Sequence, residues 1–477
     1  MRPGRRHGHH RNPRAGRVLL RISCIAGLLF GATGAFAQLP PVPVPAANPI
    51  TPQKAVLGKI LFWDEQLSSD HTVACGTCHF TEFGGADPGF GTHPGADGVF
   101  ATPDDILGSQ GVVRRDTSGA TINDPTFGFA RQVTGRAAPN FFGGLWNPEI
   151  LWDGRASSAF DDPLTGVNLI PVGGTLESQS LGPILNSVEM SKDGRGWTSV
   201  TSQLAAVAPL GLATALPPDV SLAIAANPTY PDLFNAAFGT PDVTPARIAF
   251  AIATYERTLV ADQTPWDAFV TGVGTALSPN QQDGWAFFKT STCAGCHLPP
   301  LFFDFRFASI GLRDINDDIA REAVTGLPAD RGHFKVPTLR NVGLKAGYMH
   351  TGEFPALLDV VRFYQPGAPR FLPNLSPGIP VLIPPAVEPA LVDFLQNGLT
   401  DPRVAAKTFP FDRPTLFAPE PAASWQLASG LAVLLGLRAA RARRRRVQPS
   451  GSAAAASARV RPEAWMSSSW NSNQMPW

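Results

Sequence analysis

Two copies of one short pattern, Cys-x-x-Cys-His, hold four of the five cysteines in this 477-residue chain. The residues are Cys75, Cys78 and His79 in the first copy and Cys293, Cys296 and His297 in the second. Two thiols at this spacing can add to the two vinyl groups of one porphyrin, and the following histidine can then bind the iron. The pattern therefore predicts two covalently bound haem c groups.

Other chemistry is open to paired cysteines. Two pairs can share a zinc ion, one pair can act as a redox dithiol, and pairs can form structural disulfides. The chain has nine histidines, and one directly follows each cysteine pair. Because none of the three alternatives requires that histidine, covalent haem attachment is the preferred interpretation.

The N-terminal segment favours export. An arginine-rich start precedes the apolar run of RVLLRISCIAGLLFGATGAFAQ, which ends in small residues before Gln38. This is typical of a secretory signal, residues 1–37, that is removed after Ala37 together with Cys24. An uncleaved N-terminal anchor is the alternative. Bacteria attach haem c outside the cytoplasm, so export agrees with the two haem motifs.

The C-terminal segment carries a second pattern. Pro419, Glu420 and Pro421 precede an apolar stretch that ends at Leu437, and six arginines follow within nine residues. The stretch is shorter than a spanning helix of ~20 residues, and arginines favour the cytoplasmic side. Residues 419–446 resemble the PEP-CTERM sorting signal, which implies a transient membrane anchor and cleavage by an exosortase in a Gram-negative bacterium. The tail 447–477 departs from that pattern and is predicted to be disordered.

Charge separates the two ends from the body of the chain. The whole sequence has a formal net charge of +1, but residues 38–437 hold 24 basic and 37 acidic residues. Nucleic-acid binding requires clustered Lys and Arg, so this acidic body excludes it. An acidic surface would suit a basic redox partner.

The elements that position the haem motifs are predicted to be helices and long loops. Pro245–Val260 has apolar residues at helical spacing, and Ser278 with Pro279 caps a second helix that runs into the second haem motif. Strand-like alternation is sparse, whereas Gly and Pro are abundant. We therefore expect a mostly α fold of two cytochrome-c-like haem lobes with long Gly/Pro-rich loops, at residues 48–270 and 271–415.

Further motifs resemble one family. LGKILFWDEQLSSDHTVACGTCH, LWDGRA, QSLGPILNSVEM, YPDLFNAAFG, AIATYERTLV and FKVPTLRNVGLKAGYMHTGEFPALLDVVRFY occur in this order. They resemble the bacterial dihaem cytochrome c peroxidase/MauG superfamily over about residues 48–398. The resemblance implies reduction of hydrogen peroxide at the N-terminal haem, with electrons passed through the C-terminal haem from a small periplasmic cytochrome c or cupredoxin. The alternatives are a MauG-like oxidase of a partner protein or organic substrate, and a dihaem electron-transfer cytochrome that is not an enzyme.

The resemblance also nominates a distal pocket over the first haem. The family carries Gln, then Pro four residues later, then Glu six residues after that, and Gln179, Pro183 and Glu189 keep both intervals. Cleavage of a peroxide needs a base that moves a proton from one oxygen to the other, and a carboxylate can do this. Without the resemblance, Glu189 would read as a surface carboxylate on a helix.

Two aromatic residues are assigned to electron transfer and to the second haem. Trp152 matches the family's tryptophan between the haems, and it can be a core aromatic at the same time. Tyr364 lies fourteen residues after His350, where Pseudomonas-type peroxidases have Met and MauG-type proteins have Tyr. A phenolate ligand favours oxidised iron more than a thioether does. Met349 is the alternative ligand, and neither residue ligating is the third possibility.

His93 and calcium complete the expectations. His93 follows His79 by fourteen residues, near the place of a distal histidine in peroxidases that need reductive activation, and the preferred interpretation is a loop histidine without a ligand role. The family's calcium site uses an Asn where Ala137 stands here, and carbonyls at Lys345 and Gly347. Loss of the Asn oxygen weakens a site for this cation. The Asp-rich loop GADGVFATPDD is preferred as a solvated loop over a calcium site.

Overall fold

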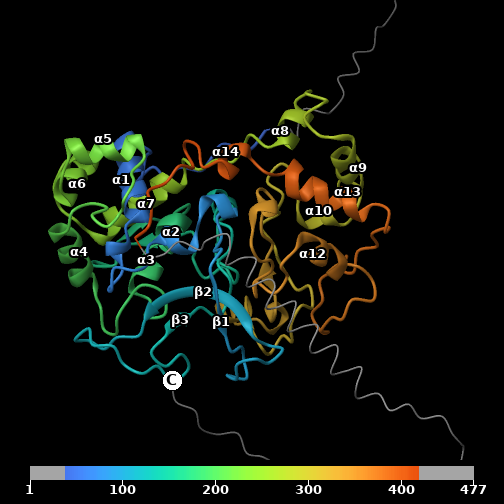
Figure 1. Cartoon of the computed structure of the whole chain (residues 1–477), viewed down its shortest axis with the longest axis horizontal. Coiled ribbons are helices and arrows are strands. Elements are labelled where there is room, and N and C mark those ends of the chain that lie inside the picture. The colour runs from blue at the N-terminus through green and yellow to red at the C-terminus, as the bar shows by residue number, and fades with distance from the viewer. Residues whose placement is uncertain (1–37, 418–477) are drawn as a thin grey trace, which may run out of the picture. The chain divides into compact units, whose positions relative to one another are not determined.

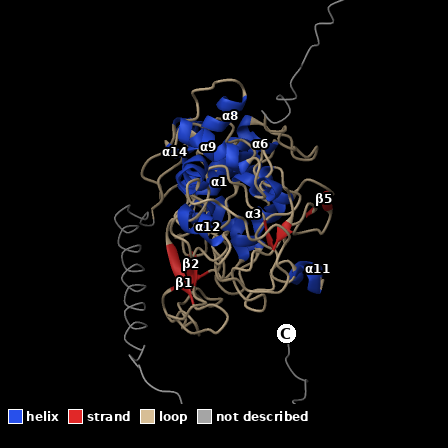
Figure 2. Cartoon of the chain, turned by 90° about the vertical axis from the view of Figure 1, so that its right-hand side faces the viewer, coloured by secondary structure: helices blue, strands red, loops and turns tan. Residues whose placement is uncertain are grey.

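Most of the regular structure between residues 38 and 417, the range that the computed structural model describes, is helical (Figure 1). The predicted signal segment 1–37, the sorting segment 419–446 and the tail 447–477 lie outside the described residues. Strands are confined to a few short pieces between the helices and loops (Figure 2).

The helices divide along the chain at about residue 260. The first group is α1 (Pro52–Trp63), α2 (Cys75–Cys78), α3 (Thr175–Leu185), α4 (Trp197–Ala206), α5 (Pro218–Ala226), α6 (Tyr230–Phe238) and α7 (Pro245–Glu256). The second group is α8 (Pro265–Val270), α9 (Pro279–Phe288), α10 (Cys293–Cys296), α11 (Glu322–Thr325), α12 (Leu357–Phe363), α13 (Glu388–Asp393) and α14 (Pro402–Ala405).

Both helices expected from local pattern are present. In α7 the Thr244 side chain accepts a hydrogen bond from the Arg247 backbone N–H, Pro245 opens the first turn, and nearly every residue is buried. In α9 Ser278 and Gln281 form a capping box. The expectation that α9 runs into the second haem motif was wrong. The helix ends at Phe288, and the motif forms its own single turn, α10.

The strands include one sheet that the sequence did not indicate. β1 (Phe90–His93), β2 (Ile106–Val113) and β3 (Arg131–Val133) form an antiparallel sheet in that order. Two small hairpins are β4 (Phe160–Asp161) with β5 (Asn168–Ile170), and β6 (Phe307–Ala308) with β7 (Phe334–Lys335). β2 is the longest strand, and it crosses the front of the view in Figure 1.

The buried apolar side chains between residues 38 and 417 include two large clusters, and the expectation of two haem lobes stays a prediction. One lies mainly on α1, α3, α6 and α7, and includes Leu57, Phe234 and Ile252. The other lies on α8, α9, α12 and α13, and includes Trp266 and Phe394. These helix groups occupy opposite sides of Figure 1. The boundary at residue 270 stays a prediction.

The last described residues return to the first cluster. Val404, Phe411 and Leu416 belong to its buried core. The Lys59 ammonium lies 2.8 Å from the Asp412 carboxylate, and the Arg413 guanidinium lies 2.7 Å from Glu82. A segment of the predicted C-terminal domain therefore packs on α1 and on the first apolar cluster.

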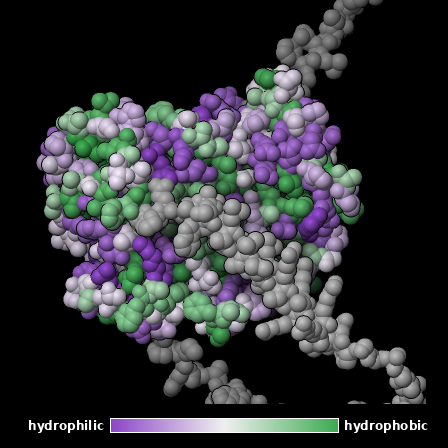
Figure 3. Space-filling model, in the orientation of Figure 1, coloured by the Kyte–Doolittle hydropathy of each residue, from purple (hydrophilic) through white to green (hydrophobic). Residues whose placement is uncertain are grey.

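The surface of the described region is mixed in character. Hydrophobic and hydrophilic residues are interspersed over the face seen in Figure 3, and single exposed apolar side chains such as Phe129 and Leu382 are ordinary on a protein surface. Between residues 38 and 417, none of the helices has the length and apolar character needed to cross a bilayer.

Candidate functional site

The first Cys-x-x-Cys-His motif forms one helical turn. Cys75 and Cys78 are the ends of α2, so their thiols lie on one side of the turn. The Thr77 hydroxyl accepts a 2.9 Å hydrogen bond from the Ala74 N–H and stabilises the start of the turn. Neither thiol is paired in a disulfide.

His79 is held in an orientation that suits metal binding. Its Nδ1–H donates a 3.0 Å hydrogen bond to the Gly85 carbonyl, because a carbonyl oxygen can only accept. This bond fixes the tautomer and leaves Nε2 available, which is the usual arrangement of a histidine that ligates a metal. Burial lowers the pKa of His79, so the neutral form needed for ligation is favoured.

The second motif repeats the arrangement. Cys293 and Cys296 end the one-turn helix α10, and both are unpaired. His297 Nδ1 lies 3.1 Å from the carbonyl oxygen of Phe302 and 3.1 Å from that of Pro337. Burial again lowers the histidine pKa.

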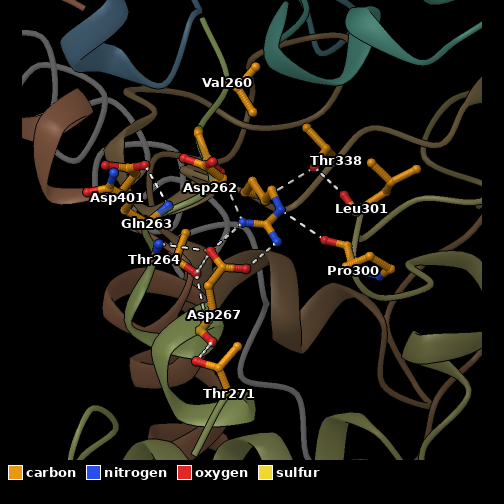
Figure 4. A network of polar contacts seen from close by, with 12 residues as sticks. Val260, Asp262, Gln263, Thr264, Asp267, Thr271, Pro300, Leu301, Thr338 and Asp401 are labelled. Carbon is orange, nitrogen blue, oxygen red and sulfur yellow. Dashed lines mark hydrogen bonds and ion pairs between the residues drawn. The ribbon is translucent and has the colours of Figure 1, made fainter. Parts of the chain in front are cut away.

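A buried ion pair holds the segments that carry these two carbonyls. The Arg340 guanidinium donates to both Asp267 carboxylate oxygens at 2.7 and 2.8 Å, and its Nε donates to the Pro300 carbonyl at 2.9 Å. The Thr338 hydroxyl donates to the Leu301 carbonyl at 2.7 Å. In Figure 4, Thr338, Leu301 and Pro300 lie on one side of this network and Asp267 on the other. The network therefore supports the backbone around His297.

Both motifs fit a covalently attached haem c. Each presents two unpaired thiols on one turn, followed by a histidine whose Nδ1–H is bound to backbone. A shared zinc site is not supported, since the described residues 38–417 contain no group of three or more His, Cys, Asp or Glu side chains arranged to hold a metal.

Glu189 lies near the first motif. Burial raises the pKa of the Cys75 thiol to about 12 and also raises the pKa of Cys78, and the charge of the Glu189 carboxylate adds to both shifts. Burial raises the pKa of Glu189 itself, and the nearby Arg155 opposes the shift. The Asn186 amide donates a 3.1 Å hydrogen bond to Glu189 Oε1. A half-buried carboxyl with a raised pKa is suited to proton transfer near neutral pH.

Gln179 and Pro183 lie on α3, the helix that leads into the Glu189 turn. They are four positions apart, so they share one face of the helix, and both are half-buried. The chain leaves α3 at Asn186, whose side chain accepts from the Val188 N–H at 2.8 Å. The three residues nominated for the distal pocket are therefore on one continuous helix and turn.

Trp152 lies where residues from both halves of the chain meet. Its Nε1–H donates a 2.7 Å hydrogen bond to the Ala137 carbonyl, and 6% of the residue is exposed. Its ring packs edge to face against His350 with centroids 6.1 Å apart, and the Lys345 ammonium lies 6.0 Å from its ring centroid. Trp152 therefore contacts segments of the first and second halves of the chain, and its place between the haems stays a prediction.

Tyr364 lies beside the second motif. It caps α12, and after burial the charges of Cys293 and Cys296 are the largest causes that raise its pKa. The phenol is thus within electrostatic reach of both thiols that would carry the second haem. Met349 has a positive φ of 67° and belongs to neither of the apolar clusters described above.

His93 is the last residue of strand β1, so the expectation of a loop residue was wrong. Its Nδ1 accepts a 3.2 Å hydrogen bond from the Gly95 N–H. His93 pairs with Ile106, three positions along β2 from Ser109, which lies near Cys78. Ile106 and Ser109 are therefore roughly 10 Å apart along the strand. The calcium site stays a prediction.

One residue near the candidate site, Asp87, had no sequence motif to nominate it. Asp87 is buried and follows His79 by eight residues. Burial raises its pKa to about 6, and its charge adds to the raised pKa of Cys78. His350, used above to locate Tyr364, stacks on Phe334 with ring centroids 3.6 Å apart. The burial of Asp87 depends on distant contacts, so a single sequence offers no signal for it. His350 lies in a quoted motif, but its stacking on Phe334 was not expected.

Comparison with known proteins gives consistent matches. Residues 52–275 match a family model described as di-haem cytochrome c peroxidase. The chain is 30% identical over 338 residues to the methylamine utilization protein MauG of Methylorubrum extorquens, covering 70% of this chain and 74% of that protein. It is 30% identical over 325 residues to cytochrome c551 peroxidase of Pseudomonas aeruginosa, covering 66% of this chain and 72% of that protein.

Solved structures show the same fold at lower identity. A MauG-like protein associated with microbial copper homeostasis aligns with a TM-score of 0.53 at 23% identity, over 80% of this chain and 97% of that one. The diheme peroxidase BthA from Burkholderia thailandensis aligns with a TM-score of 0.53 at 20% identity, over 78% of this chain and 92% of that one.

Proposed function

Because the chain belongs to the di-haem cytochrome c peroxidase family, we propose that it reduces hydrogen peroxide to water at the site of the first haem motif. The family implies that the protein is an enzyme and that its cofactors are haem c groups. The observation that carries the proposal is the half-buried Glu189, with a raised pKa, beside Cys75 and Cys78. Family membership and Glu189 both argue against an electron-transfer cytochrome without enzymatic activity.

The residues of this chain would act in the following way. Reduction of hydrogen peroxide consumes two electrons and two protons and yields two waters, and the haem groups supply the electrons when bound. His79 and His297 would bind the two irons through Nε2. Glu189 would take the proton from one peroxide oxygen and deliver it to the other, which leaves as water. Gln179 would orient the peroxide by hydrogen bonding, and Pro183 would narrow the pocket.

Electrons would enter through the second haem site and cross to the first by way of Trp152. The buried indole lies among residues of both halves, which supports a relay role. We propose a small periplasmic cytochrome c or cupredoxin as the donor, in line with the acidic body of the chain. The N-terminal pattern supports export to the periplasm or cell envelope, and the C-terminal pattern supports processing by an exosortase.

A MauG-like oxidation of a partner protein or organic substrate is the second candidate. It is favoured by Tyr364, which lies within electrostatic reach of Cys293 and Cys296 and would bind the second iron as a hard oxygen ligand. Such a ligand lowers the reduction potential, so the protein would react with peroxide from its fully oxidised state. Tyr364→Met should raise the potential of one haem and make the reaction depend on prior reduction. A redox titration that gives identical potentials in both proteins would remove Tyr364 as a ligand.

The test of the peroxidase proposal combines haem content with a rate. A pyridine haemochrome assay should give two haems c per chain in the wild type and in Glu189→Gln. The variant should react with hydrogen peroxide about 100-fold more slowly or worse, the range expected for loss of a general acid–base group. Equal rates at equal haem content would show that Glu189 is structural.

A further inference from the structure

The turn that carries Glu189 is packed along strand β2. The Val112 N–H donates a 3.1 Å hydrogen bond to the Glu189 carbonyl, and the Asp193 N–H donates a 3.0 Å bond to the Arg115 carbonyl. The segment 189–193 therefore runs beside β2 in the same direction. A sequence-distant strand supplies the backbone partners of the residue proposed for proton transfer.

Gly111 sets how closely the two segments approach. A Cβ at this position would lie 1.8 Å from the Val188 carbonyl oxygen and 2.9 Å from the Glu189 Cα. No side chain fits that space, because contacts of a Cβ below 3.0 Å are essentially never found. The chain therefore has a glycine where β2 meets the backbone beside the carboxylate.

A neighbouring strand holds the start of the same turn. The buried Gln132, in β3, donates from its amide to the Ser187 carbonyl at 2.6 Å. The Thr134 N–H and the Ser109 N–H make hydrogen bonds that tie the end of β3 to β2. The Glu189 turn is thus fastened at Ser187 and at Glu189 to two strands of one sheet.

The opposite end of β2 reaches the second half of the chain. The Leu107 N–H donates a 2.9 Å hydrogen bond to the Thr351 carbonyl, one residue after the His350 that packs on Trp152. Leu107 and Val112 are five positions apart, or roughly 17 Å along an extended strand. One strand therefore contacts both the Glu189 turn and the region of the proposed electron relay.

We propose that β2 is the positioning element for the Glu189 carboxylate, and that Gly111 determines how far that carboxylate reaches over the first haem site. The proposal rests on the function proposed above, because it assigns a task to the same carboxylate. Glu189 is the catalytic residue in this account, and Gly111 and Gln132 act through it.

The test compares two glycines that each lie against a backbone carbonyl. Gly111→Ala must displace the Glu189 turn by about 1 Å, a misplacement that can reduce a rate by up to ~100-fold. Gly284→Ala is the matched control, because its Cβ would meet the Ala390 carbonyl oxygen at 2.1 Å, a comparable backbone clash between α9 and α13 that touches neither β2 nor β3. Haem content by pyridine haemochrome identifies any variant that fails to mature.

Two readouts follow from this design: the rate of reaction with hydrogen peroxide, and the C–O stretching frequency of the reduced protein with carbon monoxide. That frequency responds to polar groups in the distal pocket. Gly111→Ala should shift the frequency in the same direction as Glu189→Gln and slow the reaction by about 10- to 100-fold. The double variant Gly111→Ala/Glu189→Gln should react less than about twofold more slowly than Glu189→Gln alone, because both changes remove the same function.

Several results would overturn the inference. These are a wild-type frequency and rate in Gly111→Ala with two haems, additive losses in the double variant, or an equal effect of Gly284→Ala. If Gly111→Ala does not mature, Gln132→Ala should give a smaller shift in the same direction, and no shift would overturn the inference. If Glu189→Gln moves the frequency without changing the rate, the acid–base role fails while positioning by β2 stands. If it moves neither, both fail.

Discussion

Removing the charge of Glu177 should lower the free energy of unfolding by several kilocalories per mole. Glu177 lies on α3, two residues before Gln179, and is fully buried. Its carboxylate accepts from the Arg257 guanidinium at 2.7 and 2.9 Å and from the Asn48 amide at 2.8 Å. Glu177→Gln keeps the shape of the side chain and leaves a buried guanidinium without its anion, a change that costs about 3–5 kcal/mol.

The protonation state of the neighbouring Glu256 carboxyl sets how much unfolding free energy is lost within that range. Burial raises the pKa of Glu256 to about 8, Arg257 opposes the shift, and the charge of Glu177 adds to it. Without that charge, Glu256 ionises more easily and offsets part of the unpaired charge on Arg257. We therefore expect a loss of about 3 kcal/mol at pH 8 and about 5 kcal/mol at pH 5, where Glu256 stays protonated.

Urea unfolding followed by circular dichroism at both pH values measures this directly. Asp242→Asn is the matched control, because it removes the charge of a carboxylate that is two-thirds exposed, 3.6 Å from Arg247. That change should alter the free energy of unfolding by less than about 0.5 kcal/mol. A loss below about 1 kcal/mol for Glu177→Gln at both pH values would show that the Glu177–Arg257 ion pair is not needed for stability. A larger loss at pH 8 than at pH 5 would show that Glu256 does not compensate for it.

Three further outcomes follow from the same contacts. The folded-state pKa of Glu256, about 8, lies above its ordinary value of 4.5, so its stabilising contribution is present below pH 4.5 and is lost as the pH rises through 8. In the wild type the urea midpoint should therefore decrease between pH 4.5 and pH 8, and in Glu256→Gln it should decrease less; an equal decrease in both proteins would show that Glu256 does not cause it. Burial raises the pKa of Glu189, so the peroxide rate should rise with pH through a midpoint above 4.5, and stopped-flow profiles of Glu189→Gln should lack that limb. Trp152→Phe loses the bond to the Ala137 carbonyl and should keep both haems while slowing electron exchange between them; flash-photolysis rates equal to wild type would assign Trp152 to packing alone.

Local pattern was sufficient for the elements whose cause is local. The helices that begin at Pro245 and Pro279 follow from an N-cap hydroxyl, a proline in the first turn and apolar spacing, and both are present. The cysteine spacing likewise places two thiols on one turn, with a histidine directly after it. These features depend on interactions within a few residues, so a single sequence displays them.

The features that sequence reasoning missed depend on distant partners. β2 was not expected, because its glycines weaken the strand pattern, yet they permit close packing at Thr134 and Val188. The hydrogen bonds of His79 and His297 to backbone carbonyls require loops that fold back. The return of Phe411 to the first cluster joins residues more than three hundred positions apart. No local periodicity encodes such contacts.

The most direct test of the account is the absorption spectrum of the purified protein on mixing with stoichiometric hydrogen peroxide, with and without prior reduction. We expect two haems c per chain and immediate consumption of peroxide with a change in the haem bands. If Tyr364 binds the second iron, this reaction should occur already in the fully oxidised protein. If the protein reacts with peroxide only after half-reduction, Tyr364 is not a ligand of the second iron, and the proposed peroxidase function still stands. A protein with both haems whose spectrum does not change in either state would contradict the proposed function.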